Sequence, residues 1–133
     1  MREGQEREKQ LPDTRRLIRL SNDAPEPTPA ARRFLSSAQA VCFSAASIRE
    51  LGLKWRKGKV NVQPRAVAEA ALACGLYELG VEPGAILVSF ELKTQHGDPF
   101  DRLLYAQAKV GRLNLLTVDE KIPRFGSAVV RAN

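Results

Sequence analysis

Asp98 and Asp101 are the acidic residues whose spacing points most directly to chemistry. They lie three positions apart around Pro99, which suits the first turn of a helix with Asp98 as its N-cap. Both carboxylates would then share one face at the positive end of that helix. Two interpretations stay open, because capping alone explains both residues, whereas an acidic site would explain why two carboxylates gather there.

Asp119 is a third acidic residue in a suggestive position. It directly follows the segment 113–118, whose sequence LNLLTV predicts a buried strand. In α/β proteins, ligands bind beyond the carboxyl ends of parallel strands. Asp119 is therefore a candidate for chemistry.

The elements that must position these residues alternate between short strands and helices. Strands are expected at 40–44, 113–118 and 127–131, with a shorter candidate at 80–83. Within 11–20 we expect a short helix capped by Asp13 and Thr14, and further helices are expected at 29–38, 46–58, 64–80 and 98–113. One or two helical turns are expected at 83–92, one at 120–126, and a proline-rich linker at 21–30. Because parallel strands need crossover helices, this order predicts the α/β class, with a mostly parallel sheet covered on both faces.

Length, composition and charge narrow the class of protein. The 133 residues fit one domain spanning 1–133, and no apolar run is long enough to cross a membrane. The charged first ten residues do not form a secretory signal, so we expect a cytoplasmic protein with no membrane partner. The net charge of +6 favours a polyanionic partner.

Cys42 and Cys74 are expected to be reduced core residues, because they stand far apart among small or apolar neighbours. Together with His96, the single histidine, they offer too few ligands for a zinc site. We expect His96 to shape the loop before Asp98 and do not assign it as a general base.

Three segments resemble VapC-type toxins of the PIN-domain family. The longest is 96–126, HGDPFDRLLYAQAKVGRLNLLTVDEKIPRFG, which is similar to the family's H-x-D-P-F-D-R-L-L-x-A-Q-A segment and L-x-T-x-D strand end. Residues 43–60, FSAASIRELGLKWRKGKV, resemble its S-A-A-S-I-x-E-x-x-x-K-x-x-x-G-K segment, and 11–23, LPDTRRLIRLSND, take the place of its L-x-D-T-H-x-L-x-W opening. The resemblance implies a three-layer α/β/α PIN-like domain and a metal-dependent endoribonuclease, the toxin of a type II toxin-antitoxin system.

Carried over residue by residue, the resemblance implies a set of catalytic and metal-binding carboxylates, namely Asp13, Glu50, Asp101 and Asp119. It implies that Asp98 is a further metal-site carboxylate, assisted by Thr14 and Thr117. Such oxygen ligands suit Mg²⁺ or Mn²⁺, and a cation relieves the repulsion among them. The resemblance also implies an RNA substrate, a cognate antitoxin and a homodimer, and it leaves open whether one or two metal ions bind.

Basic residues crowd around Glu50 and follow Asp101. The candidate RNA contacts are Arg49, Lys54, Arg56, Lys57, Lys59 and Arg102. An ordinary solvated helix face is the alternative for these residues. Trp55 and Tyr105 likewise have two interpretations, stacking on bases or packing in the core or an interface.

The amino end departs from the family pattern. The family's first strand corresponds to residues 7–12, REKQLP, whose polar content and Pro12 argue against a central strand. Arg15 and Arg19 stand where the family has histidine and tryptophan. Two alternatives stay open: the strand forms despite its sequence, or residues 1–10 are irregular or a degraded first strand and Asp13 binds metal weakly.

This departure motivates a second functional hypothesis, a catalytically silent PIN domain that acts as an RNA- or protein-binding module. A third, a helical adaptor with no nucleic-acid role, leaves the acidic residues unexplained.

Overall fold

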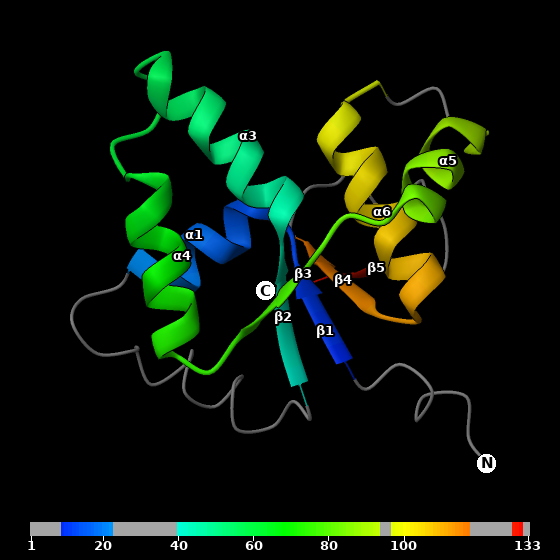
Figure 1. Cartoon of the computed structure of the whole chain (residues 1–133), viewed down its shortest axis with the longest axis horizontal. Helices are drawn as coiled ribbons and strands as arrows, with labels where there is room; N and C mark the ends of the chain where they lie inside the picture. The colour runs from blue at the N-terminus through cyan, green and yellow to red at the C-terminus, as the bar shows by residue number, and fades with distance from the viewer. Residues whose placement is uncertain (1–8, 23–39, 94–96, 118–128, 132–133) are drawn as a thin grey trace.

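The computed structural model describes residues 9–22, 40–93, 97–117 and 129–131, which form an α/β fold (Figure 1). The elements follow one another as β1 (Lys9–Pro12), α1 (Thr14–Asn22), β2 (Ala40–Ser44), α3 (Ala45–Arg56), α4 (Pro64–Ala73), β3 (Tyr77–Leu79), α5 (Pro83–Glu91), α6 (Pro99–Gly111), β4 (Asn114–Thr117) and β5 (Val129–Arg131). Most predicted elements agree with these bounds to within a few residues. Most of the expected linker at 21–30, the expected helix at 29–38 and the expected turn at 120–126 lie outside the described residues.

The five strands of the described residues form one parallel sheet in the order β3-β2-β1-β4-β5. β1 is central, since Gln10 is in register with Val41 of β2 on one side and with Asn114 of β4 on the other. The chain extends the sheet from β1 toward β3 and then returns to add β4 and β5 on the opposite side. The direction of building therefore changes between β1 and β4, and ligands of open parallel sheets bind at such a switch point.

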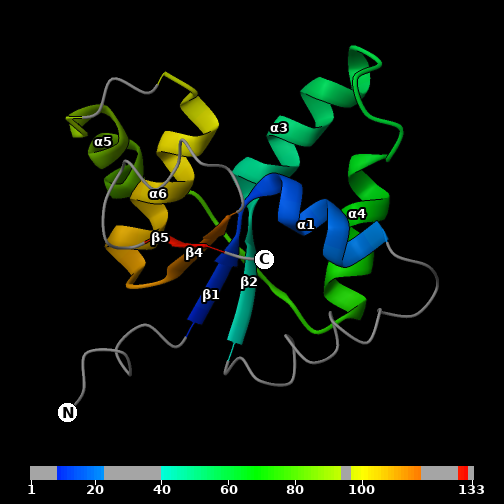
Figure 2. The same cartoon turned by 180° about the vertical axis from the view of Figure 1, so that it is seen from behind.

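Helices cover both faces of the sheet, as the two opposite views show (Figures 1 and 2). On the side of α1 and α4, the buried core contains Leu17, Val41, Phe43, Leu51, Val67, Ala71 and Leu76. On the side of α6, it contains Leu11, Cys42, Ala46, Leu104, Tyr105, Ala108, Leu113 and Leu115. Val41 and Phe43 thus face one layer and Cys42 the other, as the alternation of a strand requires. The predicted three-layer α/β/α architecture is confirmed.

Of the two alternatives for the first strand, the structure favours the one in which the strand forms despite its sequence, because residues 9–12 are the centre of the sheet, while residues 1–8 lie outside the described residues. Leu11 and Pro12 are fully buried, so burial compensates for the polar residues before them. Pro12 is tolerated for a geometric reason. The amide of Asp13 donates to the Leu116 carbonyl of β4, so the nitrogen of Pro12 faces β2, and the register with β2 extends only to Gln10.

The segment after α4 differs from the prediction of a helix at 64–80 followed by a strand at 80–83. The helix ends at Ala73, and Gly75 adopts φ 93°, a left-handed conformation that suits glycine and stops the helix. Residues Tyr77–Leu79 then pair with β2, and residues 80–82 form no strand before α5 begins at Pro83.

Both cysteines are free, Cys42 buried and Cys74 half-buried against the α1–α4 side of the core. Burial raises the pKa of the Cys42 thiol to about 11, so it stays protonated at neutral pH. This agrees with the prediction of reduced core cysteines. Within the described ranges, none of the helices has the length and apolar content that a membrane span requires.

Candidate functional site

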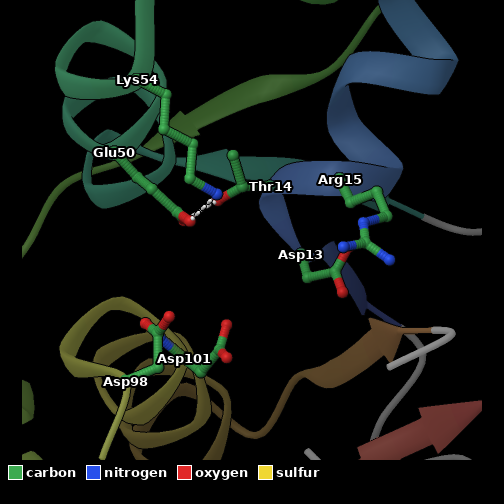
Figure 3. A pocket seen from close by; sticks show the side chains of 7 residues that line it. All are labelled: Asp13, Thr14, Arg15, Glu50, Lys54, Asp98 and Asp101. Atoms are coloured by element: carbon green, nitrogen blue, oxygen red, sulfur yellow. Dashed lines mark hydrogen bonds and ion pairs between the residues drawn. The ribbon is translucent and has the colours of Figure 1, made fainter. Parts of the chain in front are cut away.

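A polar cavity of about 110 Å³ opens beyond the carboxyl end of β1 (Figure 3). The residues that line it are Asp13, Thr14, Arg15, Glu50, Lys54, Asp98 and Asp101. They come from the β1–α1 junction, from α3 and from the first turn of α6. Segments that are remote in sequence therefore bring four carboxylates and two basic side chains to one place.

Asp13 is held at the switch point between β1 and β4. Its Oδ1 accepts a hydrogen bond of 2.8 Å from the Arg16 amide, which makes it the N-terminal cap of α1. Its Oδ2 accepts one from the hydroxyl of Thr117, the last residue of β4. With only 4% of its surface exposed, Asp13 is fixed in orientation by both of its oxygens.

Glu50 reaches the cavity from α3, a helix that Ser44 caps by accepting from the Ala46 amide. The Glu50 carboxylate is buried. Its Oε1 accepts a hydrogen bond of 2.7 Å from the Thr14 hydroxyl, and its Oε2 lies 2.8 Å from the Lys54 ammonium. The Thr14 hydroxyl also lies 3.0 Å from that of Ser47, so a short polar network joins α1 to α3.

Asp98 and Asp101 occupy the first turn of α6 and line the cavity together. Asp98 Oδ1 accepts hydrogen bonds from the amides of Phe100 and Asp101, at 2.9 and 3.0 Å. The capping interpretation therefore holds for Asp98. Because both side chains also face the cavity, capping and membership of an acidic site are compatible (Figure 3).

The predicted carboxylate set is brought together in part. Asp13, Glu50, Asp98 and Asp101 line one cavity, whereas Asp119 lies outside the described residues, as does His96. Asp98 and Asp101 face Glu50 and Asp13 across the cavity (Figure 3). Within 9–22, 40–93 and 97–117, no three His, Cys, Asp or Glu side chains converge closely enough to hold one ion. The catalytic and metal-binding roles of these residues remain predictions.

The candidate RNA contacts divide into two groups. The basic residues of α3 and the turn after it are all exposed, namely Arg49, Lys54, Arg56, Lys57 and Lys59. Arg102 instead donates a hydrogen bond of 3.1 Å to the Leu92 carbonyl at the end of α5. Trp55 is 43% exposed, whereas Tyr105 is buried among the core residues, so packing is the interpretation that holds for Tyr105.

The sequence analysis did not assign Arg15 to the cavity, and it did not identify Gln107 as a residue that connects the helices around the cavity. Arg15 lines the cavity, and its position directly after Asp13 and Thr14 was the available signal. Gln107 is buried, accepts from the Ser44 hydroxyl and donates to the Gly80 carbonyl at 3.2 Å. Gln107 thereby connects the start of α3 to α6, and no local pattern in the sequence predicts this contact.

The comparisons with known proteins agree with this architecture. The model of the PIN domain family matches residues 11–127. A chain in a toxin-antitoxin complex from Klebsiella pneumoniae has a TM-score of 0.64 and 19% identity, covering 91% of this chain and 95% of its own. A chain of VapBC2 from Rickettsia felis, bound to a promoter DNA fragment, has a TM-score of 0.70 and 16% identity, and the match covers 94% of this chain and 98% of the VapBC2 chain. A chain of FitAcB from Neisseria gonorrhoeae has a TM-score of 0.59 and 21% identity, and the match covers 92% of this chain and 96% of the FitAcB chain. No curated protein matches the sequence.

Proposed function

The chain belongs to the PIN domain family, and from this premise we propose that it is a metal-dependent endoribonuclease, the toxin of a VapC-type toxin-antitoxin pair. The observation that carries the proposal is the gathering of Asp13, Glu50, Asp98 and Asp101 on one cavity at the switch point of a parallel sheet. Like charges are costly to bring together unless a cation neutralises them.

In chemical type the donor set suits a hard divalent cation, because all four side chains offer carboxylate oxygens. Since no three of them converge on one point in the described residues, the proposed ion would draw them closer together. Thr117 and Thr14 donate to Asp13 and Glu50, which orients these carboxylates. We propose that Mg²⁺ or Mn²⁺ is held by Asp13, Glu50, Asp98, Asp101 and Asp119. Such an ion supplies an activated water and stabilises charge that develops on a phosphate.

RNA binding is supported by the exposed basic side chains of α3 and the turn after it, which suit phosphate contacts. The structures of similar fold come from complexes described as VapBC2, FitAcB and toxin-antitoxin assemblies. By analogy with these complexes, we propose that this chain has a cognate antitoxin that covers the cavity. An RNA substrate and such a partner are consistent with action in the cytoplasm.

The direct test is cleavage of a labelled RNA pool by the purified protein. We expect products with Mn²⁺ or Mg²⁺ and none when EDTA removes the metal. The silent-domain hypothesis predicts RNA binding that weakens steeply with salt and no metal-dependent product. Its motivating observation is Arg15, which lines the cavity where the resemblance has a histidine.

We further propose that the chain forms a homodimer through α5. This helix exposes Ile86, Leu87 and Phe90, of which Phe90 is 81% exposed. Its sequence holds no charged residue before Glu91, at the last position. In a chain of net charge +6, an uncharged apolar face suits a second copy better than it suits a polyanion.

Phe90→Glu is expected to halve the mass of the protein measured by light scattering, because two copies would bring glutamates into an apolar contact. Leu72→Glu is the matched control, since Leu72 is exposed on α4, away from α5. A dimer that survives Phe90→Glu, or a monomeric wild type, would show that this face is not the interface.

A further inference from the structure

Lys54 and Glu50 form an ion pair at the edge of the cavity. The Lys54 ammonium lies 2.8 Å from Glu50 Oε2, and the side chains are 47% and 8% exposed. Lysine therefore approaches from solvent, while the carboxylate is enclosed. Figure 3 shows the Lys54 side chain reaching along α3 to Glu50. The Thr14 hydroxyl contacts the other carboxylate oxygen, Oε1.

The two contacts of the Glu50 carboxylate differ in character. The Thr14 contact is buried and belongs to a hydroxyl that Ser47 also approaches, so it fixes the position of Oε1. The Lys54 contact is an i,i+4 pair whose lysine side chain is half exposed, so water screens the ion pair on the lysine side. The lysine side chain is long and flexible, so its ammonium can leave Oε2 while Thr14 keeps the carboxylate in place.

A divalent cation in this cavity would compete with the Lys54 ammonium for the Glu50 carboxylate. Lys54 lines the same cavity as Asp13, Asp98 and Asp101, and a positive charge beside Glu50 repels any cation that the carboxylates bind. It also occupies one of the oxygens that the cation would use. Binding of the cation therefore favours departure of Lys54 from Glu50.

We propose that Lys54 neutralises Glu50 until a divalent cation takes this carboxylate, and that the released ammonium then contacts an RNA phosphate. The inference rests on the proposed function in requiring a divalent cation at the cavity. It assigns Lys54 two successive partners, an internal carboxylate and the substrate.

The test measures Mn²⁺ affinity, from the electron paramagnetic resonance signal of free Mn²⁺, for the wild type, Lys54→Met and Lys109→Met. Lys109→Met is the matched control, because it removes the same charge from an exposed residue in the last turn of α6 that neither lines the cavity nor belongs to the candidate RNA contacts. We expect Lys54→Met to bind Mn²⁺ about three- to tenfold more tightly than Lys109→Met. At saturating Mn²⁺, Lys54→Met should cleave RNA more slowly than Lys109→Met.

Each outcome separates the inference from the proposed function. Equal or weaker Mn²⁺ affinity in Lys54→Met overturns the inference, even if the wild type cleaves RNA. Unchanged RNA cleavage in Lys54→Met overturns the role at the phosphate. Tighter Mn²⁺ binding in a protein that cleaves no RNA supports the competition while removing the nuclease function. Lys54→Arg, which keeps the charge, should restore an affinity close to that of the wild type.

Discussion

Asp101→Asn is expected to lower metal-dependent RNA cleavage by about a hundredfold or more while leaving the domain folded. Asp101 lines the cavity from the first turn of α6, and its side chain is half-buried. Asparagine keeps the shape of the side chain but removes its negative charge. The measurement is the initial rate of cleavage of labelled RNA with Mn²⁺, beside a thermal melt followed by circular dichroism.

Two control variants make this result specific. Glu69→Gln removes an acidic charge from an exposed residue of α4 outside the cavity, so the rate should not change. Asp98→Asn tests the neighbouring carboxylate without loss of the helix cap, because asparagine caps as well as aspartate does. If Asp101→Asn cleaves at the wild-type rate, the cleavage arises elsewhere and the assignment of this cavity is wrong.

Leu11→Ala is expected to lower the free energy of unfolding by about 3–5 kcal/mol. Leu11 is fully buried in the central strand, in the same core cluster as Leu104 and Leu115. Removing its side chain leaves a void that the close-packed layers can fill only in part. Urea denaturation followed by circular dichroism measures the change, and a loss of this size is a large fraction of the stability of an ordinary domain.

The matched control is Leu72→Ala, because Leu72 is 48% exposed on α4. This variant should change the free energy of unfolding by less than about 1 kcal/mol. A similarly small change for Leu11→Ala would contradict the central, buried position of β1.

The elements that the sequence predicted well carry their own local signals. The start of α6 is an example, since Asp98 and Pro99 are a cap and a first-turn residue, and both act as such. β1 could not be predicted in this way, because Lys9 and Gln10 are polar and the strand depends on neighbours supplied by β2 and β4. The helix expected through residue 80 overlooked the stop that Gly75 provides.

The candidate site was predictable to a similar degree. Local spacing singled out Asp98 and Asp101, whereas Asp13 and Glu50 came from the family resemblance. The contact of Thr117 with Asp13 joins residues 104 positions apart, so no local pattern could reveal its geometry. Lys54 and Glu50 are four residues apart on one helix, and their ion pair was within reach of the sequence.

The order of the strands also affects when the cavity can exist during synthesis. Asp13 and Glu50 leave the ribosome early, but Asp98 and Asp101 follow much later, and Thr117 of β4 is needed to hold the first aspartate. A nascent chain that ends before α6 has only half of the carboxylates that line the cavity. Since β4 also pairs with the central strand β1, completion of the sheet and assembly of the cavity both require β4. Any activity of the cavity is thereby withheld until β4 has been synthesised.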